Sequence, residues 1–171
     1  LHAFDLEKVE GRKIIVREAL EGEKILTLDE VERNLSSSDL VIADATKPIG
    51  IAGVMGGFDT EITSSTKYVL LEGANFNGKS VRLTSKRFGL RTEASTRFEK
   101  GIDSNLSQTA VERVCQLIEE IGAGIVVKGN IDVYKKVKEE STIALRPARV
   151  NKLLGIDIPV ETMISYLNGL G

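Results

Sequence analysis

Short apolar runs broken by glycine and charged residues fill residues 13–71, a pattern typical of β-strands in a sheet. The runs at 13–20 and 24–28 are separated by Glu21-Gly22-Glu23 and predict a hairpin. Further strands are expected at 31–35, where the meander continues, and at 39–44, 49–55 and 68–71. The first half of the chain is therefore predicted to be dominated by sheet.

Helical patterns follow. Asn77 is suited to cap a helix over 78–88 that stops at Gly89. A second helix is predicted over 105–121, capped by Asp103 or Ser104 and stopped by Gly122, with one apolar face formed by Leu106, Ala110, Val114, Leu117 and Ile121. The segments 124–127 and 130–134 are predicted to return to strand.

A charged run at 135–141 favours a linker, and two short helices are predicted beyond it at 147–154 and 160–167, closed by Gly155 and Gly169. Their apolar residues lack neighbours within the chain. We therefore expect a domain over 1–138, and over 139–171 a linker with the truncated start of a following module. The predicted fold class is α+β, with mixed and antiparallel sheets, a few helices packed on them, and the short helical start of that module.

Composition and net charge exclude several classes of binding site and fold. The formal net charge of -2 excludes nucleic-acid binding through the overall field of the chain, so any such role depends on a local patch. A single cysteine, Cys115, and a single histidine, His2, exclude a disulfide framework and a multi-histidine metal site. No apolar run reaches the length of a membrane span, and no signal peptide is visible. A cytoplasmic protein is expected.

Glu72 and His2 are the two candidate site residues with the clearest chemistry. Glu72 ends an apolar strand, where a carboxylate is partly desolvated and needs a donor. That donor is either a structural partner or a substrate group such as a phenolic hydroxyl. His2 lies among apolar residues, with Asp5 able to orient a ring nitrogen. It is either a satisfied structural histidine or a ligand contact.

Three further segments remain open between structural and functional interpretations. The run IAGVMGG at 51–57 lacks the Lys-Ser/Thr of a P-loop and the dinucleotide spacing, so it is either a tight turn or a close-approach pocket wall. The hydroxyl-rich residues 92–96 either line a pocket or cap a helix. A basic stretch is either an RNA footprint or a solvated helix face, and its first members are Lys79, Arg82, Lys86 and Arg87.

Five segments, taken in order, resemble the beta subunits of bacterial phenylalanyl-tRNA synthetases. They read LHAFD at 1–5, DLVIAD at 39–44, IAGVMGG at 51–57, LLEGANF at 70–76 and GLRTEASTRFEKGID at 89–103. The run LRPARVNKLLG at 145–155 is similar to the opening of the next module of that subunit. The resemblance therefore covers nearly the whole chain.

The resemblance implies an α+β editing domain that hydrolyses mischarged tyrosyl-tRNA(Phe), because a pocket built for phenylalanine cannot strongly reject an added hydroxyl. It implies that Glu72 recognises the tyrosine hydroxyl and that His2 lies near the ester and the terminal ribose. Gly53 and Gly56 would shape the pocket, with Thr92 and Ala94 as its other wall. A positioned water would attack the ester without a nucleophilic side chain.

The resemblance also implies partners. These are the acceptor end of tRNA(Phe) and an alpha subunit, in a parent heterotetramer of two alpha and two beta subunits. The fragment would need no cofactor, since the parent enzyme uses ATP and magnesium elsewhere. The family contributes further pocket residues from before the LHAFD motif, which leaves the activity of the isolated chain open.

Two alternative functions are retained from the residues themselves. The first is a non-catalytic module that positions tRNA or braces the subunit interface, indicated by the basic stretch at 79–100. The second is a small-molecule phosphate-binding protein built on the glycine-rich run at 51–57.

Overall fold

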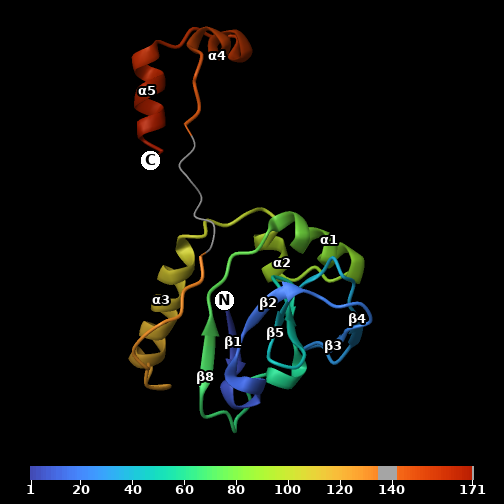
Figure 1. Cartoon of the computed structure of the whole chain (residues 1–171). Helices are drawn as coiled ribbons and strands as arrows, with labels where there is room; N and C mark the ends of the chain where they lie inside the picture. Colours follow the sequence, from blue (N-terminus) through green and yellow to red (C-terminus); the bar gives the residue numbers. More distant parts are fainter. Residues whose placement is uncertain (135–141, 171) are drawn as a thin grey trace. The chain divides into compact units, whose positions relative to one another are not determined.

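The computed structural model describes residues 1–134 and 142–170, which belong to two compact units, 1–127 and 128–171 (Figure 1). The predicted linker at 135–141 and the predicted domain boundary after residue 138 lie outside the described residues. We describe each unit by itself. The first unit carries all the strands that the structure describes, and the second carries two helices.

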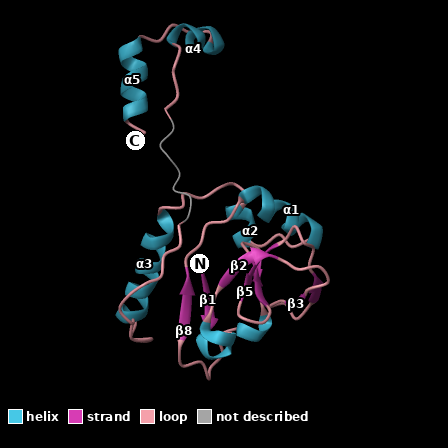
Figure 2. Ribbon diagram, viewed as in Figure 1, coloured by secondary structure: helices cyan, strands magenta, loops and turns pink. Residues whose placement is uncertain are grey.

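A four-stranded antiparallel sheet forms the centre of the first unit (Figure 2). Its order is β2 (Ile15–Glu18), β5 (Leu40–Ala43), β6 (Pro48–Ile51) and β7 (Met55–Gly56). The predicted strand at 39–44 is confirmed as β5, and the run at 49–55 folds into two short strands joined by a tight turn. Both faces of β5 are covered, because Val41 joins one apolar cluster and Ile42 joins another.

Two smaller antiparallel pairs flank this sheet. One joins β1 (His2–Asp5) to β8 (Val69–Glu72), which matches the strand predicted at 68–71. The other joins β3 (Lys24–Leu26) to β4 (Glu32–Asn34). Short 3-10 turns lie beside these strands, at Leu6–Lys8, Glu10–Arg12 and Phe58–Thr60.

The predicted hairpin between 13–20 and 24–28 is wrong. Strand β2 pairs with β5 and strand β3 pairs with β4. The intervening residues form a local turn instead of a ladder, because Glu23 binds the Arg17 guanidinium at 2.6 Å and accepts the Leu20 N–H at 2.7 Å. This turn directs the chain away from β2, and the buried strand β5 takes the place of the expected partner.

Helices α1 (Gly78–Phe88) and α2 (Glu93–Phe98) cover one side of the sheet, through Val81 and Phe98 in the first apolar cluster. The prediction for α1 is confirmed. The Asn77 side chain accepts from two backbone N–H groups of the first turn, and Gly89 adopts the left-handed conformation that ends the helix. For residues 92–96 the capping interpretation is confirmed, because Thr92 and Ser95 form a capping box at the start of α2, although the extent of this helix was not predicted.

Helix α3 (Leu106–Glu120) confirms the long predicted helix but corrects its cap and its face. The cap position is Asn105, and the Asp103 carboxylate accepts from the Asn105 N–H, before the helix begins. The half-buried face is shifted from the predicted one and comprises Ser107, Ala110, Val111, Val114, Cys115 and Ile118. Leu106, Leu117 and Ile121 are exposed.

The close approach of Gly73 to α3 explains this shift. A Cβ at Gly73 would meet the Val111 side chain and would lie 3.0 Å from the Ser107 carbonyl oxygen. The small residue lets the chain leaving β8 pack directly on the Ser107–Val111 face of the helix. Contact geometry, and not the number of apolar residues, therefore selects the face that packs.

The second unit contains α4 (Pro147–Leu154) and α5 (Val160–Asn168), which confirms both predicted helices.

The strands predicted at 124–127 and 130–134 are wrong: no strand lies there, and Ile125 and Ile131 are almost fully exposed. Isolated strands leave their backbone groups unpaired, and the described residues provide no partner strand for them. None of the described helices is long and apolar enough to cross a membrane.

Two apolar clusters stabilise the first unit. The larger one joins the sheet to α1 and α2, and the smaller one lies under β1 around Phe4, Ile42 and Ile49. Phe76 packs against both clusters and joins them. Sheets covered by separate helices confirm the α+β class.

Candidate functional site

The β1–β8 pair places His2 opposite Glu72. The two residues are register partners in an antiparallel ladder, although they are far apart in the sequence. Side chains of directly opposed residues point to the same face, with Cβ atoms about 5 Å apart. In Figure 1 the blue strand β1 runs alongside the green strand β8. The two candidates with the clearest chemistry therefore lie together.

Glu72 carries an unusual carboxylate. Its Oε2 atom is buried and has no hydrogen-bond partner within the described chain, and no cation there forms an ion pair with it. Burial raises the pKa of Glu72. An unpaired buried acceptor carries a desolvation penalty of about 1–3 kcal/mol. Glu72 is thus able to accept a hydrogen bond from a donor that binds at this position.

Burial lowers the pKa of His2 and thereby favours its neutral form. The ring packs edge-on against Phe4, with ring centroids 4.5 Å apart. A neutral imidazole offers one donor and one acceptor, so His2 can both donate to and accept from polar groups beside it.

Asp5 does not orient the His2 ring, contrary to the sequence-based expectation. The two residues are separated by an odd number of strand positions and point to opposite faces of β1. The Asp5 carboxylate accepts instead from the Glu7 N–H at 3.1 Å and from the Thr66 hydroxyl at 2.8 Å. Packing against Phe4 and Gly56 fixes the ring.

Gly56 provides the space that the His2 ring occupies. A Cβ at this glycine would lie 2.7 Å from the Nε2 atom of His2, and closer still to its Cε1 atom. The Leu28 side chain borders the same space, at 3.2 Å from that Cβ position. Sequence reasoning did not find Leu28, because its N–H reaches the Gly56 carbonyl through a pairing that no local pattern encodes.

Gly53 and Thr92 form a second group on the other side of the turn at 51–57. Gly53 has a positive φ of 69°, and a Cβ there would lie 2.8 Å from the Val81 side chain and 3.1 Å from Phe76. The Thr92 hydroxyl donates to the Val54 carbonyl at 2.8 Å. Helix α2 is therefore tied to the turn, with Ala94 exposed in its first turn.

The glycine-rich run is a tight turn of the sheet. Several of its N–H groups are already used there: Ala52 donates to the Leu40 carbonyl at 3.0 Å, Val54 to the Ile51 carbonyl at 2.9 Å and Gly57 to the Ile49 carbonyl at 2.8 Å. A phosphate cradle needs N–H groups that point at the ligand. The run therefore serves to position Gly53 and Gly56, which weakens the phosphate-binding alternative.

The basic residues of α1 divide into two kinds. Lys79, Arg82 and Lys86 are exposed, and within the described chain none of them forms an ion pair. Arg87 pairs with the buried Asp39 carboxylate, and its guanidinium lies 3.9 Å from the Phe88 ring centroid. RNA binding by all four stays a prediction, and Arg87 has in addition a structural role that the sequence did not indicate.

Asp39 is the buried centre of that structural role. Besides Arg87, the carboxylate accepts from the Thr84 hydroxyl at 2.9 Å and from the Ser36 N–H at 2.7 Å. The network links α1 to the loop before β5. Among the described residues, no group of three or more His, Cys, Asp or Glu side chains is arranged to hold a metal ion.

Comparison with known proteins shows the family to which the chain belongs. The family model described as the B3/4 domain matches residues 1–123. Three similar proteins are named phenylalanine–tRNA ligase beta subunit. That of Moorella thermoacetica is 51% identical over 99% of this chain and 21% of its own length. Those of Clostridium tetani and Geobacter metallireducens are each 45% identical over 99% of this chain, covering 22% and 21% of their lengths. The chain thus spans about a fifth of these relatives, and the resemblance inferred from the motifs is confirmed.

Proposed function

Because the chain belongs to the B3/4 domain family, we propose that it is the part of a phenylalanine–tRNA ligase beta subunit that hydrolyses tyrosyl-tRNA(Phe). One observation carries the proposal. The buried Oε2 atom of Glu72 has no partner in the described residues and lies on the strand pair that also presents His2. This site offers an acceptor for a hydroxyl and, beside it, a neutral imidazole.

The acceptor explains the choice of tyrosine over phenylalanine. An ionised carboxylate only accepts hydrogen bonds, and a phenol is a donor that can satisfy it. Phenylalanine would leave Glu72 buried and unpaired, which is the kind of loss that gives strong discrimination. An aminoacylation site shaped for phenylalanine cannot exclude the extra hydroxyl of tyrosine as strongly as Glu72 can exclude phenylalanine. A second site of this kind therefore corrects the errors of the first.

Hydrolysis in this proposal uses a water molecule that attacks the carbonyl carbon of the aminoacyl ester. The ester bond breaks, the ribose oxygen leaves with a proton, and free tyrosine is released. His2 orients polar atoms at the ester through its donor and acceptor nitrogens, and no side-chain nucleophile takes part. We assign no cofactor to this step, and we place the ATP- and magnesium-dependent aminoacylation in an alpha subunit.

Deacylation of tyrosyl-tRNA(Phe) by the complete ligase carrying this sequence tests the proposal. Glu72→Ala removes the acceptor, and Gly56→Trp fills the space of the His2 ring, so both should slow tyrosine release by at least about tenfold. Leu20→Ala, which shortens an exposed side chain outside the proposed site and the basic row, is the control and should leave the rate unchanged. Unchanged rates in both site variants would refute the assignment of Glu72 and Gly56 to the editing pocket.

A second function is favoured by the row of exposed cations on α1, Lys79, Arg82 and Lys86. In this second function the three side chains bind the tRNA backbone, and the module itself catalyses no reaction. Reversing the three charges should then weaken tRNA binding and flatten its salt dependence by about 0.7–0.9 in log–log slope per lost contact. The pocket variants should in that case leave deacylation unaffected.

A further inference from the structure

The turn between β3 and β4, residues 27–31, extends the four-stranded sheet beyond its last strand. Strand β7 is the end of that sheet, and residues 27 and 28 pair with its other side. Thr27 forms a bridge with Gly57, and the Leu28 N–H donates to the Gly56 carbonyl at 3.1 Å. The turn therefore covers an edge that would otherwise present unpaired backbone groups.

This turn brings Leu28 close to the His2 ring. The Leu28 Cδ1 atom and the His2 Nε2 atom lie 3.2 Å and 2.7 Å from one point, the position that a Cβ would take at Gly56. Both side chains also line the same hollow beside β1. The ring is therefore bounded by Phe4 from its own strand and by Gly56 and Leu28 from the end of the sheet.

Arg33 locks the shape of the turn. Its guanidinium binds the Asp29 carboxylate through two contacts of 2.7 Å and also donates to the Thr27 hydroxyl. That hydroxyl donates in turn to Asp29 at 2.6 Å, and Thr27 is fully buried. Because a two-pronged arginine–carboxylate pair fixes both distance and direction, these three side chains hold the turn as one unit.

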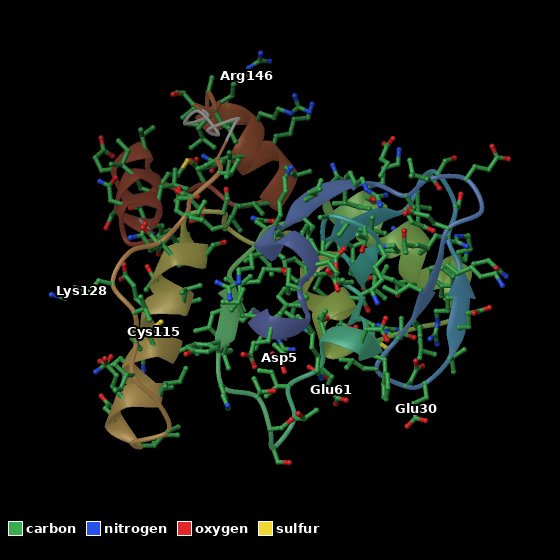
Figure 3. All side chains as sticks on the ribbon, turned by 60° about the horizontal axis from the view of Figure 1, so that its bottom comes forward. Asp5, Glu30, Glu61, Cys115, Lys128 and Arg146 are labelled. Carbon is green, nitrogen blue, oxygen red and sulfur yellow. The ribbon has the colours of Figure 1, made fainter. Side chains whose placement is uncertain are left out.

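The backbone of the turn needs such a lock. Glu30 has a positive φ of 60°, a conformation that residues other than glycine seldom adopt. Its N–H donates to the Thr27 carbonyl at 2.8 Å, while its side chain is exposed and points away from the unit (Figure 3). A conformation of this kind persists only where the surroundings stabilise it, and the Arg33–Asp29 pair does so here.

We propose that Arg33 is a positioning residue for the imidazole of His2, on which it acts through this turn. By holding the turn in shape, Arg33 keeps Leu28 and Gly56 beside the ring, and these two residues keep the ring in its buried position. The described residues that line the hollow beside His2 do not include Arg33, so its action is indirect. The placement of the ring follows from these contacts, and its effect on hydrolysis rests on the function proposed above.

A pH titration of the His2 ring signals by proton NMR, on the 171-residue chain, tests the proposal. His2 is the only histidine in the sequence, so its ring signals are identified directly. Arg33→Met removes the guanidinium and keeps an apolar stem. The ring should then leave its buried position, and its pKa should rise toward the ordinary value of 6.5. Its nuclear Overhauser contact with the Leu28 methyl groups should weaken.

The ion pair stays ionised throughout this titration. The hydrogen bond from Arg33 lowers the pKa of Asp29, whereas an imidazole titrates between about pH 5 and about pH 8. The charged groups near the ring are Glu72 from β8, Glu61 at the hollow and the amino terminus of the 171-residue chain, and they are the same in every variant. A shift of the His2 midpoint therefore reports the position of the ring.

Glu32→Gln is the matched control, because it removes the other ion pair between the same two strands, that of Lys24 with Glu32 at 2.7 Å. The His2 midpoint should not move in this variant. Asp29→Asn, a milder change that keeps the size of the side chain, should shift the midpoint in the same direction as Arg33→Met. An unchanged midpoint in both, or in Asp29→Asn if Arg33→Met does not fold, would refute the positioning role. An equal shift in the control would refute it too, since any loosening of the hairpin would then move the ring.

Deacylation of tyrosyl-tRNA(Phe) by the complete ligase separates this inference from the proposed function. Arg33→Met should lower kcat by about tenfold or more and change KM little, because the imidazole loses its orientation while the Glu72 acceptor remains. A shifted His2 midpoint with an unchanged kcat would leave the placement of the ring intact and overturn the role of His2 in hydrolysis. A lowered kcat with an unchanged midpoint would show that Arg33 acts by another route, which contradicts the inference.

Discussion

Replacing Gly56 with alanine should displace the His2 ring, because the added methyl group would lie 2.7 Å from the Nε2 atom of that ring. The backbone itself tolerates the exchange, since Gly56 does not have a positive φ. The change is therefore a steric perturbation of one contact. Overpacking of this kind costs about 1–3 kcal/mol of unfolding free energy.

A double-mutant cycle isolates the contact. In a His2→Ala background the same methyl group enters the space left by the ring, so Gly56→Ala should be close to neutral there. The coupling between the two positions should then be about 1–3 kcal/mol, within the range for residues in direct contact. Urea unfolding of the four chains, followed by circular dichroism, measures it.

Gly50→Ala is the matched control. Gly50 is the register partner of Gly56 across β6 and β7, and the nearest atom to its added Cβ would lie at an ordinary 3.7 Å. We expect little change in stability there. An equal penalty for Gly56→Ala with and without the His2 ring would refute the account of how this site is assembled.

Burial raises the pKa of Glu72, so its protonation stabilises the folded chain below the ordinary value of 4.5, and this contribution is lost as pH rises through the raised pKa. The melting temperature of Glu72→Gln relative to that of the unmodified chain should therefore rise as the pH increases above 4.5, and a difference that stays constant with pH would contradict this sign. Arg87→Ala should cost about 1–3 kcal/mol because Asp39 loses its charged partner, whereas Arg82→Ala should stay within about 0.5 kcal/mol in urea unfolding; equal effects would contradict the ion pair. Thr92→Ala should cost about 1 kcal/mol through loss of the α2 cap, and an unchanged urea midpoint would argue against that cap.

Local patterns predicted α1, α3, α4 and α5, but they predicted neither the extent of α2 nor the packing face of α3. Helix α1 begins after Asn77 and ends at Gly89 because of contacts within a few residues of each end, and such contacts can be predicted from the sequence. The β2–β3 hairpin failed for the opposite reason. Its two runs have the right composition, but the Glu23 contacts with Arg17 and Leu20 redirect the chain. Strand pairing depends on such contacts and on the availability of β5.

In the candidate site, too, local features could be predicted from the sequence and long-range pairings could not. Glu72 could be singled out because a carboxylate ends an apolar strand, and the resemblance gave His2 a role. Their opposition could not be predicted, since it depends on the pairing of β1 with β8. The role of Arg87 was also hidden, because its partner Asp39 is buried by a fold that brings α1 to the loop before β5.

A crystal structure of the chain soaked with tyrosinamide would show whether the Glu72 carboxylate binds the phenol. The phenol oxygen should lie about 2.5–3.0 Å from that carboxylate, with the amide end directed toward His2. Phenylalaninamide, soaked under the same conditions, should leave the site largely unfilled. A phenol that points away from Glu72, or equal occupancy by phenylalaninamide, would contradict the claim that this buried carboxylate selects tyrosine.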